Sequence, residues 1–170
     1  MAADKPIDEL YGLIQKIEVA MFTTRRADGS LVSRPMATQK RDPVADLWFV
    51  TDIESHKLDE LEQDPQVNLG YFDTRSWEWV SVSATATVST DRQRIRDLYQ
   101  ADWKAWFGAI DSVRDGGPDD PRLALILVDA HGAIYMKREK SKPVVLFEVA
   151  KAMITGKPPE VGRTRKLKLG

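Results

Sequence analysis

The feature that most constrains this chain is a strict alternation of side-chain polarity over residues 79–88. One set of positions is apolar and the other is mostly hydroxylated: Val80, Val82, Ala84, Ala86 and Val88 alternate with Trp79, Ser81, Ser83, Thr85 and Thr87. Successive side chains of a strand point to opposite faces of a sheet, so this pattern predicts an antiparallel strand with one buried and one polar face.

Several further segments have the character of strands, and the turns between them are tight. Strands are expected at Val19–Thr24, Leu31–Thr38, Leu47–Thr51, Gln66–Asp73, Leu123–Asp129 and Ala133–Arg138. Helices are expected from about Pro6 to Ile17, from Ser55 to Asp64, from a capping box at Thr90 through Ile95–Phe107, and from Ser141 to Gly156. This order predicts a mainly β protein with flanking helices (α+β), built on a small antiparallel barrel of six or seven strands, and it disfavours a doubly wound parallel sheet.

Length and composition restrict the classes of function. We expect one domain over residues 1–170, with a tail from about residue 157 that is a short strand or flexible. The 25 basic and 26 acidic residues nearly balance, which predicts neither a nucleic-acid nor a membrane partner. The chain has no cysteine, only two well-separated histidines, and no secretory signal or membrane-spanning segment, so we expect a cytoplasmic protein without a metal site.

One stretch suggests an anion site. Ser55 is a good N-cap residue for the helix that follows Leu47–Thr51, and His56 and Lys57 come directly after it. Together with Arg34 on the preceding strand, Ser55 and Lys57 could hold a phosphate dianion. The alternative is an ordinary capped helix with a solvated lysine, and the spacing alone favours that alternative. Pro35, which cannot donate to a sheet ladder, indicates an edge strand or a bulge beside Arg34.

Four segments in this order are similar to one known family. SRPMATQ, LWFVTDIESHKLDEL, DPQVNLGYF and VSVSATATV resemble the FMN-binding split-barrel superfamily of pyridoxamine-5'-phosphate oxidase, in its bacterial general stress protein branch. LYGLIQKIEVAMFTT, KAWF, DDPRLALILV and ITGKPP extend the resemblance over nearly the whole chain. The resemblance implies a six-stranded antiparallel split barrel that forms homodimers, with FMN at the dimer interface.

The resemblance also assigns roles to individual residues around the phosphate and the ring. Arg34 and Lys57 match the basic residues that bind the FMN phosphate, and Ser55 matches their hydroxyl partner. Pro35 and Met36 match positions whose backbone reaches the edge of the isoalloxazine.

Further matches lie elsewhere in the chain. Val50 and Thr51 match positions beside the ribityl chain, and His56 replaces a second phosphate-binding arginine, which should weaken phosphate binding at neutral pH. Trp79 stands where the oxidase has a flavin-contacting glutamine. Trp106 is expected to approach the flavin of the other subunit, and a core position is the equal alternative.

The departures from the oxidase leave several functions open. The chain lacks the Arg-x-His pair near the C-terminus with which the oxidase binds its substrate, so pyridoxamine phosphate oxidation is not expected. The hypotheses are an FMN-binding stress protein that acts as a flavin carrier or weak oxidoreductase, an oxidoreductase using a nicotinamide or a deazaflavin, and a flavin-independent dimeric interaction module. The sequence identifies no catalytic acid–base pair, and it does not decide between FMN and FAD.

Overall fold

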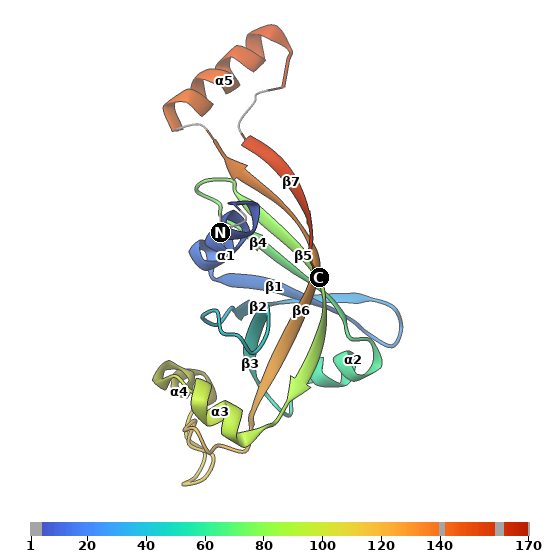
Figure 1. Cartoon of the computed structure of the whole chain (residues 1–170), viewed down its shortest axis with the longest axis vertical. Coiled ribbons are helices and arrows are strands. Elements are labelled where there is room, and N and C mark those ends of the chain that lie inside the picture. Colours follow the sequence, from blue (N-terminus) through green and yellow to red (C-terminus); the bar gives the residue numbers. More distant parts are fainter. Residues whose placement is uncertain (1–4, 140–141, 159–161, 170) are drawn as a thin grey trace.

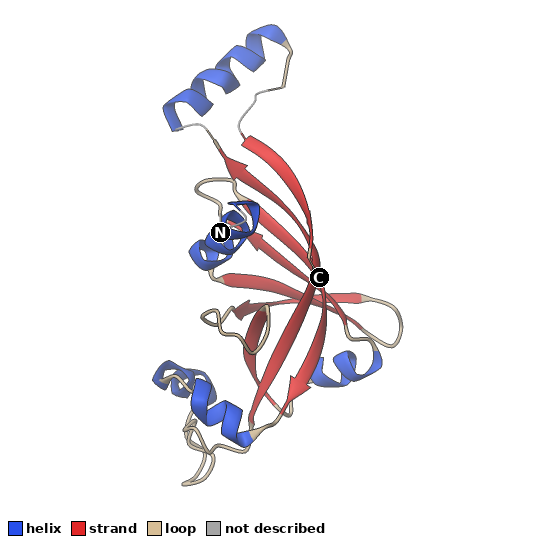
Figure 2. Ribbon diagram, in the orientation of Figure 1, coloured by secondary structure: helices blue, strands red, loops and turns tan. Residues whose placement is uncertain are grey.

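The computed structural model describes residues 5–139, 142–158 and 162–169 and consists of one strongly curled antiparallel sheet with helices at its margins (Figures 1 and 2). The helical segments are α1 (Lys5–Ile17), α2 (Lys57–Gln63), α3 (Arg92–Leu98), a 3-10 turn (Ala101–Trp103), α4 (Lys104–Phe107) and α5 (Lys142–Thr155). The strands are β1 (Val19–Arg25), β2 (Leu31–Ala37), β3 (Leu47–Asp52), β4 (Gln66–Phe72), β5 (Trp79–Ser89), β6 (Leu123–Arg138) and β7 (Gly162–Lys168). None of the described helices is both long and apolar enough to cross a membrane.

The sheet is a six-stranded half-barrel with a seventh strand attached. Its order is β2-β1-β4-β5-β6-β3, and β7 pairs with the second half of β6. The predicted barrel of antiparallel strands with flanking helices is therefore confirmed. Because β2 and β3 end the row, the curl brings these two edges toward each other, and Pro35 lies on an edge strand as its missing N–H requires.

The alternation in β5 builds the main core. Val80, Val82, Ala84 and Ala86 are buried on the concave face of the sheet. The apolar stripe of α1, including Leu10 and Ile14, covers the same face. Phe22 on β1, the second strand of the row, and Phe49 on β3, the last strand, meet edge to face with ring centroids 5.2 Å apart, which closes the core across the half-barrel.

A second, smaller core lies on the other face of β3 and β6. It contains Trp48, Ile95, Trp103, Leu123 and Leu125, so the strand Leu123–Asp129 is buried on both faces as its continuous apolar pattern predicted. The ring of Trp103 packs edge to face against Trp48 and Tyr99, at centroid distances of 6.1 and 5.4 Å.

The turn expected at residues 130–132 is absent, because β6 runs unbroken from Leu123 to Arg138. The register against β5 shifts there, so that His131 is the extra residue of a bulge between Ala130 and Gly132. Gly132 serves close packing in place of a turn, since a Cβ at this position would lie 3.1 Å from the carbonyl oxygen of Leu167 on β7. The tail after residue 161 forms strand β7, the first of its two expected states.

The single helix expected over Ile95–Phe107 is also wrong. The chain is extended at Gln100, where φ is −125° and ψ is 138°, and this break separates α3 from the following 3-10 turn. Packing decides the break, because it lets Trp103 enter the second core. The helix is capped by Asp91, whose carboxylate accepts hydrogen bonds from the amides of Gln93 and Arg94, one residue later than the predicted cap at Thr90.

Candidate anion site at the mouth of the half-barrel

Arg34 lies on the edge strand β2. We call the region that it shares with Thr51 at the end of β3 and with Ser55 and Lys57 at the start of α2 the mouth of the half-barrel. Arg34 pairs with Phe22 across the ladder and so shares the concave face with that core residue. Its guanidinium donates to Thr24 Oγ1 at 2.8 Å and forms an ion pair with the carboxylate of Glu60 on α2, at 2.8 Å from Nη2 to Oε2. Among the described residues, these contacts occupy Nη1 and Nη2 and leave the Nε–H of Arg34 without an acceptor.

Lys57 reaches the same mouth from the first residue of α2. Its ammonium donates to Thr51 Oγ1 at 2.8 Å and to Ser55 Oγ at 2.6 Å. Thr51 is buried at the end of β3 on the concave face, so the two hydroxyls and the ammonium form a compact polar cluster. Both hydroxyl partners are neutral, and therefore the positive charge of Lys57 has no directly bonded carboxylate.

The predicted capping role of Ser55 is wrong. The N-cap residue of α2 is His56, and no side chain caps this helix. The Ser55 hydroxyl instead accepts from Lys57, while its carbonyl oxygen accepts from the amide of Leu58. Because α2 has only seven residues, the anion-binding character of the mouth depends on side chains and little on a helix dipole.

The electrostatics of the mouth favour a bound anion. Burial and the nearby guanidinium of Arg34 lower the pKa of Lys57. The pKa of Glu60 falls despite its burial, because hydrogen bonds from Thr24 and Arg34 outweigh the desolvation. Glu60 is thus a carboxylate already neutralised by Arg34, with Arg26 Nε 3.4 Å away, and Lys57 retains a charge that an incoming phosphate could balance.

Sequence reasoning missed Glu60 and Thr24. Glu60 lies three residues after Lys57, so both project from one side of a helix, and Leu61 beside it is buried. An acidic residue at a core-facing helical position needs a cationic partner, and this was the available signal. Nothing in the sequence pointed to Thr24.

Other predicted site residues lie on different surfaces. Met36 shares the concave face with Arg34, whereas Pro35 points to the convex face. Val50 is half-buried against the second core, so its side chain faces away from Thr51. Trp79 lies on the convex face of β5, three strands away from β2 in the sheet, and the chain does not bring it to Arg34.

His56 and Trp106 point into solvent. The side chain of His56 is 96% exposed, and its Nδ1 lies 3.9 Å from a carboxylate oxygen of Asp59. It does not join the cluster around Lys57. Trp106 on α4 is 84% exposed, which excludes the core position within the chain and leaves the indole available to a neighbouring molecule.

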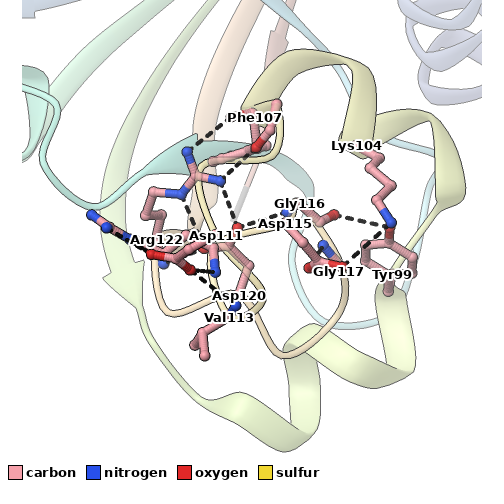
Figure 3. Close-up of polar contacts among 12 residues, drawn as sticks. Tyr99, Lys104, Phe107, Asp111, Val113, Asp115, Gly116, Gly117, Asp120 and Arg122 are labelled. Atoms are coloured by element: carbon pink, nitrogen blue, oxygen red, sulfur yellow. Dashed lines mark hydrogen bonds and ion pairs between the residues drawn. The ribbon is translucent and has the colours of Figure 1, made fainter.

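A buried ion pair holds the segment that follows Trp106 (Figure 3). The Asp120 carboxylate accepts hydrogen bonds from the amide of Gly116 and from the guanidinium of Arg122, at 2.7 Å for each closest contact. The same guanidinium donates to the carbonyl oxygens of Phe107 and Gly108. Arg122 therefore holds the end of α4 in place, and with it the backbone that carries the exposed Trp106.

The donor set at the mouth fits the phosphate of a flavin mononucleotide. Two cations and two hydroxyl groups converge there, and Arg34 and Lys57 are the types of side chain that hold phosphate oxygens. Within the described part of the chain, no group of histidine, aspartate and glutamate residues could hold a metal ion.

Comparison with known proteins shows which family the chain belongs to. Protein bli-3 of Neurospora crassa is 39% identical over 170 residues, which cover 96% of this chain and 80% of that protein. A candidate general stress protein 26 from Jannaschia sp. CCS1 has the same fold, with a TM-score of 0.74 and 22% identity over 98% of this chain and 100% of the other. The general stress FMN/FAD binding protein of Xanthomonas citri gives a TM-score of 0.66 and 23% identity over 82% of this chain and 93% of its own. The family model for pyridoxamine 5'-phosphate oxidase-like proteins matches residues 5–160, and this chain belongs to that family.

Proposed function

We propose that this protein is a flavin-binding general stress protein that holds FMN by its phosphate at the mouth of the half-barrel and acts as a flavin-dependent oxidoreductase or flavin carrier. One observation carries the proposal. The Lys57 ammonium is half-buried beside Arg34, and among the described residues its hydrogen bonds go to the hydroxyls of Thr51 and Ser55 alone. The carboxylates of Asp52 and Glu60 act on Lys57 without a hydrogen bond to it, and Glu60 is already paired with Arg34, so a phosphate dianion would supply a directly bonded counter-ion.

The residues at the mouth bind and orient in this proposal. Lys57 and the Nε–H of Arg34 would hold phosphate oxygens, and the hydroxyls of Ser55 and Thr51 would turn from acceptors of the lysine into partners of the phosphate and ribityl chain. Pro35 and Met36 would approach the ring through their backbone. When bound, the flavin supplies the redox chemistry. The sequence offers no acid–base pair for a further catalytic step, and we do not propose pyridoxamine phosphate oxidation.

Comparison with the solved structures supports the cofactor without choosing its form. The Xanthomonas citri protein is an FMN/FAD binding protein. The groups at the mouth could hold one phosphate, which is the number that FMN has, so we expect FMN. FAD would fit only if its second phosphate and its adenosine extended into solvent.

We also propose that the protein is a homodimer with the flavin at the interface. The convex face of the sheet carries a run of exposed apolar side chains, which we call the convex patch: Val19, Met21, Phe72 and Trp77, with Pro35 and Trp79 at its borders. Exposed apolar surface of this extent is typical of an interaction site. The patch adjoins the backbone of Pro35, so a second copy seated there would lie next to the proposed ring position.

Titration of two flavins tests the phosphate site. Replacing Lys57 with Ala removes one charge-assisted hydrogen bond, so FMN affinity should fall about tenfold to a hundredfold, while riboflavin, which lacks the phosphate, should bind as before. Lys40→Ala, at an exposed lysine outside the mouth, is the matched control and should change neither affinity. Equal loss of both flavins would indicate general damage. If the wild type retains no flavin at all, the dimeric interaction module replaces the proposal.

A further inference from the structure

The described part of the chain leaves most of the surface of helix α5 uncovered. It stands beyond the ends of β6 and β7, away from the rest of the sheet (Figure 1). Over the described side chains, residues 143–155, none is buried, and Leu146, Phe147, Met153 and Ile154 are between 67% and 87% exposed. Only three of its fourteen residues are charged, namely Lys142, Glu148 and Lys151. A helix that is apolar around most of its circumference is typically buried.

The convex patch is a second apolar surface that the described residues leave exposed. Met21 pairs with Pro35 on one side and Gly70 on the other, and Phe72 follows Gly70 on the same face beside Trp79. The patch therefore crosses four neighbouring strands. Gly70, at the centre of the patch, has no side chain, so the patch is flat there. The space above it is open, since a Cβ at this position would meet no atom closer than 4.0 Å.

The rim of the patch is held in an unfavourable backbone conformation that exposes an aromatic ring. Trp77 has φ 62°, a region that bulky side chains rarely occupy, and its side chain is 69% exposed. Its ring packs edge to face on Phe72 at 5.9 Å. Lys16 forms ion pairs with Asp73 and Glu78, on either side of Trp77 in the β4–β5 hairpin. These contacts hold the backbone of Trp77 in its unfavourable conformation. A strained, exposed tryptophan is more consistent with a contact surface than with a free loop.

We infer that α5 of one copy docks on the convex patch of a second copy, and that the two copies exchange their helices reciprocally. This inference rests on the homodimer proposed above and names the contact that forms it. The exposed helix and the convex patch belong to the same chain. In a two-fold symmetric dimer, the two helices can therefore cover the two patches at once, whereas a different protein bound to one of these surfaces would leave the other exposed.

The available area also favours reciprocal exchange. A 14-residue helix is about 21 Å long and 11 Å across, so burying half its circumference on a partner removes roughly 700 Å² from water per seat, counting both surfaces. A single seat falls below the roughly 1,200 Å² of a stable interface, while two seats exceed it, at about 1,400 Å².

Two double variants test the exchange by sedimentation equilibrium of the full chain. Phe147→Asp/Ile154→Asp alters the helix at positions seven residues apart, which lie on one face. Met21→Asp/Phe72→Asp alters the patch. Each variant places unpaired charges in both apolar seats, so the dimer dissociation constant should rise at least about 100-fold in either. The control Gln63→Glu/Thr90→Asp adds acidic groups at exposed polar positions and should dimerise as the wild type does.

An equimolar mixture of the two variants identifies the seat. A mixed dimer contains one intact helix facing one intact patch, so the mixture should associate more strongly than either variant alone and less strongly than the wild type. If α5 instead docks on α5, the mixture should associate no more strongly than the variants do alone. That result would overturn the inference.

The remaining outcomes separate this inference from the proposed function. A helix variant that dimerises like the wild type overturns the exchange but leaves the homodimer and the flavin site standing. If wild type, but not the helix variant, then sediments with phosphatidylcholine–phosphatidylserine vesicles, α5 binds membranes instead. A monomeric wild type overturns both the dimer and the exchange. Lys57→Ala should bind FMN about tenfold to a hundredfold more weakly while its dimer persists, so the cofactor proposal is judged independently.

Discussion

Arg34 on the edge strand β2 and Glu60 on α2 form an ion pair of 2.8 Å at the mouth of the half-barrel. The side chain of Glu60 is 10% exposed and that of Arg34 is 25% exposed, so the pair is largely shielded from solvent. Glu60 also accepts from Thr24 at 2.5 Å. One carboxylate thus links β1, β2 and α2, and it holds the guanidinium that we assign to phosphate binding.

Removing that carboxylate should destabilise the fold. Glu60→Ala leaves Nη2 of Arg34 and the hydroxyl hydrogen of Thr24 without their acceptor, and we expect the free energy of unfolding to fall by about 1–3 kcal/mol. Urea denaturation followed by circular dichroism measures the change. Glu62→Ala, at an exposed position of the same helix, should cost less than about 0.5 kcal/mol. Equal effects of the two substitutions would show that the ion pair does not support the fold.

The pH dependence of FMN binding should reflect Lys57. Because burial and Arg34 lower its pKa below the usual 10.5, the free protein loses this charge at a lower pH than an ordinary lysine does. FMN affinity should therefore start to fall with rising pH before 10.5, whereas riboflavin affinity should not follow it. Fluorescence titrations of both flavins between pH 7 and 10 provide the comparison, and a constant ratio of the two affinities across that range contradicts the assignment.

The buried Asp120–Arg122 pair should govern stability in acid. Hydrogen bonds from Arg122 lower the pKa of Asp120 to about 2, below the roughly 3.9 of an unfolded chain. A carboxyl group with a lowered folded pKa stabilises the protein above the unfolded pKa, and this contribution disappears as the pH falls from about 4 to 2.

Asp120→Asn tests that contribution. It leaves Arg122 buried without its counter-ion and should cost about 3–5 kcal/mol at neutral pH. The loss relative to wild type should shrink as the pH falls toward 2, as measured by thermal unfolding at a series of pH values. Asp119→Asn changes an exposed ion pair with Arg96 and should cost less than about 1 kcal/mol. A pH-independent difference for Asp120→Asn would assign its effect to packing.

The two faces of β5 should respond differently to charge. Val82 is 1% exposed on the concave face, so Val82→Asp buries an unpaired carboxylate and should leave the domain unfolded at 25 °C. Ser83→Asp, on the exposed convex face, should retain a cooperative unfolding transition in circular dichroism. Similar losses in the two variants would mean that the convex face is buried in an assembly, and sedimentation of Ser83→Asp then decides that point.

Local patterns in the sequence determined the strands and which of their faces are buried. The alternation in β5, the doubly apolar Leu123–Asp129 and the edge position of Pro35 all follow from the period of two along a strand and from the hydrogen bonds that each residue can make. The basic and hydroxyl residues of the mouth were also recognisable, since Arg34, Ser55 and Lys57 flank adjacent elements and matched a known family. These features are local in the sequence, and burial of one face is enough to specify them.

Only the tertiary structure decided which side chains meet. The split of residues 92–107 into short helices depends on packing of Trp103 against Trp48, and the unbroken β6 depends on the approach of β7 to Gly132. The partnership of Glu60 with Arg34 and Thr24 joins residues 26 and 36 positions apart, and no sequence period encodes such a contact. The sequence by itself therefore determined the faces of the elements, whereas the curl of the sheet determined the contacts between them, because a contact between distant residues exists only once its two elements have been packed together.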